Sequence, residues 1–195
     1  VVVKLNTMVV DYVDDTVHFS NGETIQTKNL IWAAGVSAKA FEGIPEESYG
    51  RGKRMATDAF NKVNGTQNIY AIGDTCIQLT DEGFPNGHPQ VAQVAIQQGI
   101  NLAQNFKLLK DNKQMRPFKY HDKGSMAIIG KNKAVVDLPK PKMHFKGFFA
   151  WMIWLFIHLI SLIAYRNRVK TFYNWMIAYF SKDQSLRMII RPDKN

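Results

Sequence analysis

The sequence contains a single cysteine, Cys76, among 195 residues, and it has no Cys-x-x-Cys pair. One thiol excludes a framework of intrachain disulfides, and no cluster of cysteines and histidines has the spacing of metal ligands. Without a second cysteine there is also no dithiol that could carry electrons. We therefore predict that Cys76 is a small packed thiol, because unpaired cysteines behave as small hydrophobic residues in protein cores.

Acidic residues are scarce in the last part of the chain. Residues 139–195 contain ten lysines and arginines but two aspartates, whereas residues 1–138 contain 15 basic and 14 acidic residues. A basic segment is attracted to nucleic acid or to an anionic membrane. Here the basic residues alternate with long apolar blocks and not with isolated stacking aromatics, so the pattern favours a phospholipid surface and no nucleic acid.

Glycine-rich phosphate-binding turns are missing as well. The G-x-G-x-x-G turn that opens a complete dinucleotide-binding domain does not occur. The chain begins at Val1, already within a strand-like run and without an initiator methionine. These features predict a fragment of a longer protein.

A short apolar run followed by a helix organises the centre of the chain. Residues 69–72 are typical of a buried strand, and Gly73 and Asp74 follow them. A glycine at this point lets a ligand approach the backbone closely, and an aspartate at the end of a strand can accept hydrogen bonds from sugar-like hydroxyls. Pro89 then suits the first turn of a helix, which we expect to continue to about Leu109.

That helix has small residues along one side and amides along another. Its amino terminus offers free N–H groups and the positive end of the helix dipole, which suits the edge of a flavin that gains negative charge on reduction. Gln93 and Gln97 share one face, and Gln90 and Gln104 are expected to face water. The small residues recur at spacings of three and four, and they are Ala92, Ala95, Gly99 and Ala103.

Two motifs in this stretch resemble those of type II NADH dehydrogenase, the single-subunit NADH:quinone oxidoreductase. The I-G-D of residues 72–74 is shared by many flavoproteins, but the A-Q-V-A-I-Q of residues 92–97 is much more specific to this family. The resemblance extends over nearly the whole chain and covers the C-terminal portion of the family. It implies an α/β fold, namely an incomplete two-dinucleotide-binding-domain (Rossmann-like) flavoprotein fold with a C-terminal pair of amphipathic membrane-binding helices.

The resemblance implies FAD as the cofactor, NADH as the substrate and a membrane quinone as the acceptor. Gly73 and Asp74 would bind FAD, with Asp74 at its ribityl chain or pyrophosphate. The helix terminus at Val91 and Ala92 would face the pyrimidine edge of the flavin. The lack of paired redox cysteines fits direct transfer from flavin to quinone.

Further site residues follow from the same resemblance. Gln93 and Gln97 would line the quinone pocket, where an amide binds a carbonyl without the cost of burying a charge. Lys131, in the run G-S-M-A-I-I-G-K-N-K-A-V, matches a position near the flavin ring; a cation there would stabilise reduced flavin and relay protons, and a surface lysine is the alternative. Gly35 would touch the cofactor at the end of a strand, and a tight turn is the alternative.

The remaining segments before the tail have simpler patterns. Residues 1–31 predict β structure with an Asn-Gly hairpin turn, and residues 30–36 predict a buried strand. Residues 37–67 are irregular, and residues 118–137 predict strand, turn and strand. A basic cluster that we interpret as part of a solvated loop consists of Arg51, Lys53 and Arg54.

The tail contains an uncharged segment followed by an amphipathic one. Residues 148–165 carry no formal charge and would span about 27 Å as a helix, the lower limit for crossing a bilayer. Polar His158 and Ser161 on one face, and tryptophans in the body of the segment, argue instead for an interfacial helix pair. Two packed core helices or a dimer interface are the alternatives. The predicted apolar stripe of the second segment is Val169, Phe172, Tyr173, Met176, Ile177 and Phe180.

These patterns divide the chain into three parts. Residues 1–36 would end the NADH-binding domain, residues 37–138 would belong to the FAD-binding domain with its quinone-site helix, and residues 139–195 would be a membrane-anchoring tail. The parent protein would oxidise NADH through FAD and reduce quinone without pumping protons, as a peripheral (monotopic) protein on the cytoplasmic face of a bacterial inner membrane, and the fragment alone would be inactive. Sulfide:quinone oxidoreductase and a non-catalytic membrane-binding module are the alternatives, and the tail could also form a homodimer.

Overall fold

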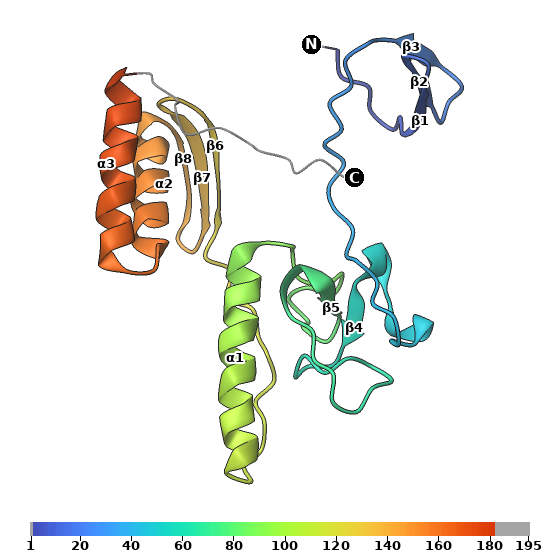
Figure 1. The fold of residues 1–195 in the computed structure, drawn as a ribbon, viewed down its shortest axis with the longest axis vertical. Coiled ribbons are helices and arrows are strands. Elements are labelled where there is room, and N and C mark those ends of the chain that lie inside the picture. Colours follow the sequence, from blue (N-terminus) through green and yellow to red (C-terminus); the bar gives the residue numbers. More distant parts are fainter. Residues whose placement is uncertain (1, 182–195) are drawn as a thin grey trace, which may run out of the picture.

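The computed structural model describes residues 2–181, which form three small sheets and three α-helices (Figure 1). The strands are β1 (Val9–Val13), β2 (Thr16–Phe19), β3 (Thr24–Gln26), β4 (Met55–Thr57), β5 (Cys76–Gln78), β6 (Ser125–Gly130), β7 (Lys133–Pro139) and β8 (Lys142–Gly147). The helices are α1 (Ala92–Lys110), α2 (Phe148–Ser161) and α3 (Tyr165–Ser181), and the short 3-10 turns are η1 (Glu46–Ser48), η2 (Arg51–Lys53) and η3 (Gly73–Thr75).

The first sheet is an antiparallel meander of β1, β2 and β3. This confirms the predicted β structure within residues 9–26 and the turn at Asn21-Gly22, where Gly22 has a φ of +83° that glycine adopts without strain. Residues 2–8, which were also expected to be β structure, form no strand. The strand predicted at residues 30–36 is wrong. Those residues have no regular structure, and Ile31 and Trp32 are 92% and 61% exposed. A buried strand needs neighbours on both edges, and the described residues provide none for it.

The second sheet is a parallel pair of β4 and β5. Apart from β4 and two short 3-10 turns, residues 37–67 are irregular, as predicted. A small core lies beside it, formed by Met55, Val63, Ala71 and Cys76. The strand predicted at residues 69–72 is wrong, because that run makes one isolated bridge, between Lys62 and Tyr70. The strand forms a few residues later, as β5, after the turn η3.

Helix α1 begins three residues after the predicted start at Pro89. Residue Val91 still has extended backbone, with φ −135° and ψ 149°, and Ala92 is the first helical residue. The helix ends at Lys110, close to the predicted Leu109, and the following turn at Asp111 and Asn112 is also as predicted. The helix therefore starts at the A-Q-V-A-I-Q hexapeptide itself.

The third sheet is an antiparallel meander of β6, β7 and β8, with α2 packed on one face and α3 beside α2 (Figure 1). Strands β6 and β7 confirm the predicted strand, turn and strand. Strand β8 lies within the segment that was expected to be a membrane-anchoring tail, and the expected boundary at residue 138 falls inside β7. The core of this unit contains Ala134 and Val136 of β7 and Ala150 of α2.

The uncharged segment at residues 148–165 is not one continuous helix. Helix α2 ends at Ser161, and the chain turns at residues 162–164, where Ala164 has a φ of +69°. At 14 residues, α2 is about 21 Å long, which is shorter than the hydrocarbon core of a bilayer. Within residues 2–181, no helix is both long enough and apolar enough to span a membrane.

Candidate functional site

The turn at Gly73 packs directly against α1. Gly73 has a φ of +67°, and a Cβ atom added there would lie 3.0 Å from the Cβ atom of Ala95. Its backbone N–H donates a 2.7 Å hydrogen bond to the side-chain oxygen of Gln98. Gln98 is fully buried, and sequence reasoning missed it because a glutamine in a helix ordinarily faces water. With its positive φ and this close approach to α1, the position favours glycine over any residue with a side chain.

Asp74 lies on the outer side of the same turn and is exposed. Its backbone carbonyl accepts a 3.2 Å hydrogen bond from the side chain of Gln90, which is exposed as predicted. The carboxylate accepts no hydrogen bond within residues 2–181 and so is available to a ligand. The exposed residues Val91 and Ala92 mark the start of α1 after the same loop.

Arg54 ties together the segments that surround this turn. Its Nε donates 2.7 Å to the carbonyl of Cys76, and its Nη2 donates 3.2 Å to the carbonyl of His88. Partial burial lowers the pKa of Arg54, and the Cys76 and Asp74 side chains partly offset that effect. The interpretation of Arg54 as a residue of a solvated loop is therefore wrong, whereas Arg51 and Lys53 are exposed as expected.

Cys76 is buried at the start of β5, which confirms the predicted packed thiol. The Gln98 amide donates to its Sγ at 3.4 Å, and the Asn61 amide donates at 3.9 Å. Burial raises the pKa of the thiol more than these neighbours lower it. The buried environment therefore favours the protonated thiol.

The two glutamines of the hexapeptide both bind backbone. Gln93 donates 2.8 Å to the carbonyl of Gly124 and accepts 3.1 Å from the N–H of Lys123. Gln97 donates 2.9 Å to the carbonyl of His121 and accepts 3.0 Å from the N–H of the same residue. Each amide thus binds an extended segment much as a neighbouring strand would.

The same pattern recurs at the other end of α1. Asn105 donates 2.9 Å to the carbonyl of Arg116 and accepts 2.8 Å from its N–H. Segment 116–124 therefore runs back along α1 with its backbone bonded to side-chain amides. Between these points the N–H of Phe118 donates to the carbonyl of Ala59 at 2.7 Å.

A buried hydrogen-bonded pair of Asp81 and His88 fixes the loop before α1 to the same segment. Nε2 of His88 lies 3.0 Å from Oδ2 of Asp81, among the rings of Phe84, Phe118 and Tyr120. Desolvation would raise the pKa of Asp81, but hydrogen bonds from His88 and from the N–H groups of Tyr120 and Gly83 outweigh it and lower the pKa. Desolvation and the nearby Asp122 carboxylate raise the pKa of Tyr120 to about 12. Sequence reasoning missed this pair, since the two residues lie in a polar loop.

Lys131 and Gly35 lie away from the turn at Gly73. Lys131 donates 2.7 Å to the carbonyl of Tyr179 in α3, and its Nζ lies 4.1 Å from the centre of the Tyr179 ring. Gly35 lies in the irregular, exposed segment with a φ of +89°, and within residues 2–181 nothing comes within 4 Å of the place that a Cβ atom would take. The described residues therefore bring Gly73, Asp74 and the start of α1 together, but not Lys131 or Gly35.

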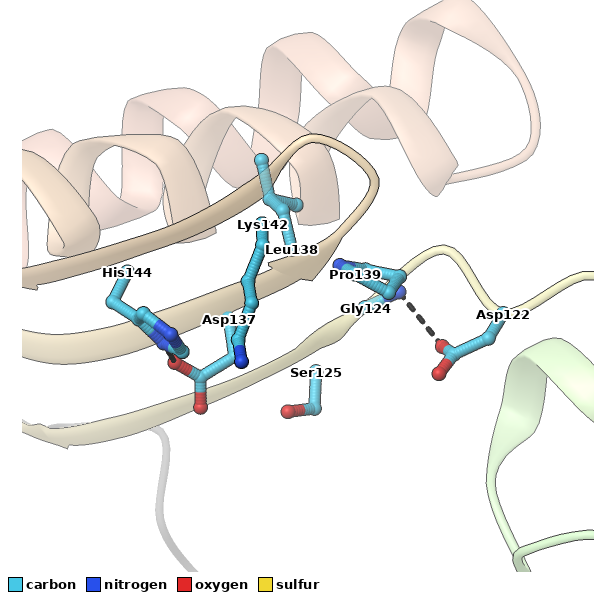
Figure 2. Close-up of a pocket in the computed structure, with 8 residues that line it drawn as sticks. All are labelled: Asp122, Gly124, Ser125, Asp137, Leu138, Pro139, Lys142 and His144. Carbon is cyan, nitrogen blue, oxygen red and sulfur yellow. Dashed lines mark hydrogen bonds and ion pairs between the residues drawn. The ribbon is translucent and has the colours of Figure 1, made fainter.

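An open pocket of about 370 Å³ lies where segment 116–124 enters the third sheet (Figure 2). The N–H of Gly124 donates 2.8 Å to Asp122 at one end of the pocket, and Asp137 pairs with His144 at the other. Gly124 has a φ of +97°, and a Cβ atom there would lie 2.3 Å from the carbonyl oxygen of Asp137. The backbone of Gly124 is therefore packed tightly against Asp137 of β7, where segment 116–124 leads into β6.

Helices α2 and α3 leave a broad apolar surface uncovered. They pack against each other through Trp154 and Trp175, and through Trp151 and Tyr179. His158 bonds the carbonyl of Trp154 and makes a polar contact within the helix. The predicted stripe of α3 is exposed at every position, and α2 adds further exposed side chains. The exposed apolar residues of the two helices include Phe149, Met152, Phe156, Ile160, Val169, Phe172, Tyr173, Met176, Ile177 and Phe180.

Two protein-family models match this chain, one over its first part and one over its last part. Residues 1–99 match the pyridine nucleotide-disulphide oxidoreductase model, and residues 122–184 match the NDH2 C-terminal domain. The chain therefore belongs to the pyridine nucleotide-disulphide oxidoreductase family. Together the two matches confirm the resemblance to the C-terminal portion of a type II NADH dehydrogenase and the α/β fold class that it implied.

Individual relatives agree with this assignment. The chain is 34% identical over 193 residues to type II NADH:quinone oxidoreductase NdhA of Mycobacterium tuberculosis, covering 92% of this chain and 39% of NdhA. It is 31% identical over 181 residues to the mitochondrial internal alternative NAD(P)H-ubiquinone oxidoreductase A1 of Arabidopsis thaliana, covering 85% of this chain and 35% of that protein. The chain thus spans less than half the length of these relatives.

A solved structure shares the fold. The structure of NDH2 from Plasmodium falciparum in complex with NADH matches with a TM-score of 0.71 at 20% identity, over 90% of this chain and 51% of that one. At this identity the match establishes the fold alone.

Proposed function

We propose that the complete protein oxidises NADH through FAD and reduces a membrane quinone without pumping protons, and that residues 1–195 are an inactive portion of it. The observation that carries the proposal is the contact of Gly73 with α1 at the A-Q-V-A-I-Q hexapeptide. Both partners of this contact lie within residues 1–99, which match the pyridine nucleotide-disulphide oxidoreductase model, and α1 then leads towards the residues that match the NDH2 C-terminal domain.

The residues around Gly73 fit a flavin nucleotide. Beside the buried Gly73, Asp74 presents an exposed carboxylate, and the exposed Val91 and Ala92 open α1. In the proposal Asp74 accepts hydrogen bonds from the ribityl or ribose hydroxyls of FAD, and the α1 dipole stabilises negative charge at the edge of the ring. The bound flavin would supply the chemistry, accepting hydride from NADH and returning two electrons to quinone.

We assign Gln93 and Gln97 to the quinone side of the site, Lys131 to the surroundings of the flavin ring, and Gly35 to a contact with the cofactor. Lys131 is bound to Tyr179 here, so its proposed approach to the flavin would require that contact to be released. Residues 1–36 would complete the NADH-binding domain, residues 37–138 the FAD-binding domain, and residues 139–195 the membrane-binding part. The last assignment includes β8 as the support for α2.

The exposed apolar faces of α2 and α3 fit a peripheral membrane protein. Their large side chains are uncovered, as Phe156 at 64% and Phe180 at 77% illustrate, and the surrounding lysines and arginines would attract anionic phospholipid. We propose a monotopic attachment to the cytoplasmic face of a bacterial inner membrane. A homodimer through the same faces is the competing proposal, which analytical ultracentrifugation in detergent distinguishes.

Flavin content of the full-length protein tests the site. Asp74→Ala should lose most of the bound FAD, because the hydroxyls it accepts would be left without a partner. Glu82→Ala removes another exposed carboxylate and should retain FAD. Equal flavin content in both variants would remove Asp74 from the site. A full-length protein with no flavin at all would favour the non-catalytic membrane-binding module, and sulfide-dependent reduction of the flavin would favour sulfide:quinone oxidoreductase.

A further inference from the structure

Three side-chain amides of α1 each form two hydrogen bonds to the backbone of segment 116–124. Each pair of bonds goes to one residue or to two adjoining residues. Asn105 binds both backbone groups of Arg116, Gln97 binds both of His121, and Gln93 binds the N–H of Lys123 and the carbonyl of Gly124. All six distances lie between 2.8 and 3.1 Å. A segment that pairs with no strand among the described residues therefore has these polar groups satisfied by one helix.

These bonds fix the point at which α1 joins the third sheet. Gly124 is bonded through its carbonyl to Gln93 and through its N–H to Asp122, as Figure 2 shows for the latter. Gly124 then passes so close to Asp137 that no side chain fits between them. A shift of Gly124 would therefore move the pocket and the sheet that carries α2 and α3.

We propose that Gln93 and Gln97 are positioning residues, which hold the backbone of residues 121–124 on α1 and thereby fix the pocket and the sheet beneath α2 relative to the site helix. Their influence on a quinone would be exerted through this backbone. The part of the inference that concerns the quinone rests on the proposed function, whereas the holding of the backbone does not.

Two substitutions of Lys123 separate positioning from direct contact. Lys123→Pro removes the N–H that Gln93 accepts but leaves the Gln93 side chain in place. Lys123→Ala keeps that N–H and serves as the matched control, because the Lys123 side chain is exposed. If Gln93 acts by positioning, Lys123→Pro and Gln93→Met should both raise the KM for ubiquinone-1 in the full-length protein severalfold, and Lys123→Ala should not. The rate of flavin reduction by NADH should be unchanged in all three variants.

Hydrogen exchange of the full-length protein provides a readout that does not depend on quinone. Loss of one backbone hydrogen bond should speed exchange of the His121 amide by about tenfold in Gln97→Met, and of the Lys123 amide similarly in Gln93→Met. Gln104→Met, on an exposed part of the same helix, should change neither.

Each outcome decides one part of the inference. Unchanged exchange in Gln93→Met and Gln97→Met would overturn the holding of the backbone, and this result needs no folded Lys123→Pro protein. The positioning role would be overturned if exchange became faster while the KM for ubiquinone-1 stayed unchanged. It would also be overturned if the KM rose in Gln93→Met but not in Lys123→Pro. A wild-type protein that exchanges as expected but never reduces ubiquinone-1 would instead contradict the proposed function.

Discussion

The N–H of Gly73 and the side-chain oxygen of Gln98 form a 2.7 Å hydrogen bond between the I-G-D turn and the middle of α1. Both residues are buried, and the same glutamine donates to Cys76 through its nitrogen. One side chain therefore holds the turn and the start of β5 at the helix. The arrangement explains how the turn is placed without a long parallel sheet in the described residues.

Replacing Gln98 should loosen this turn. Gln98→Met leaves the buried N–H of Gly73 without an acceptor and should lower the free energy of unfolding by about 2 kcal/mol. Urea denaturation of the full-length protein measures the effect. Gln104→Met makes the same chemical change on an exposed part of α1 and should stay near the wild-type value; equal losses in both variants would show that Gln98 has no special role.

A side chain at Gly73 should be poorly tolerated. Gly73→Ala places a methyl group 3.0 Å from Ala95 in a backbone with φ +67°, and the strain should cost about 1–3 kcal/mol. Gly130→Ala provides the comparison, because nothing in the described part of the chain lies within 4 Å of its added Cβ atom. Thermal unfolding should shift clearly for Gly73→Ala and little for Gly130→Ala. A similar melting temperature for both would contradict the close packing of turn and helix.

The Asp81–His88 pair predicts a loss of stability in acid. Because folding lowers the pKa of Asp81, the carboxylate stabilises the fold above its unfolded pKa of about 3.9. That contribution is lost as the pH falls through the lower folded pKa. Asp81→Asn should therefore flatten the decline in unfolding free energy below about pH 4. Glu82→Gln, which changes an exposed neighbour, should retain the wild-type decline.

The exposed stripe of α3 predicts membrane binding that salt only partly reverses. Phe172→Ser with Met176→Ser removes apolar area worth about 2 kcal/mol, so partitioning to anionic vesicles should fall roughly thirtyfold. Ala178→Ser, exposed on the same helix, should have little effect. High salt should weaken binding without abolishing it, because screening acts on the basic residues alone. Unchanged vesicle binding in the double variant would contradict the interfacial role of this face.

Local patterns predicted the elements that depend on nearby residues. The meander β1–β3 follows from alternating residues and an Asn-Gly turn, and the pair β6–β7 follows from two apolar runs around a polar turn. Strand β8 has the same alternation, with Met143 and Phe145 between Lys142, His144 and Lys146. Because its lysines also fit a basic tail, residues 142–147 were assigned to the membrane-anchoring part and β8 was not predicted.

The errors arise where distant residues decide the structure. An apolar run such as residues 30–36 becomes a strand only beside other strands, and residues 69–72 give way to β5 because the chain must first turn at Gly73. The roles of Gln98 and Arg54 depend on partners about 25 and 22 to 34 residues away, which no local period reveals. The motif pointed to the turn at Gly73 and to α1, but the contacts between them could be seen only in the fold.

The proposed activity is tested most directly by single-turnover absorbance of the full-length protein reconstituted in anionic vesicles. NADH should bleach the flavin absorbance in the absence of oxygen, and ubiquinone-1 added afterwards should restore it with one quinone reduced for each flavin. Flavin that NADH does not bleach, or reduced flavin that ubiquinone-1 does not reoxidise, would contradict the assignment of this chain to an NADH:quinone oxidoreductase.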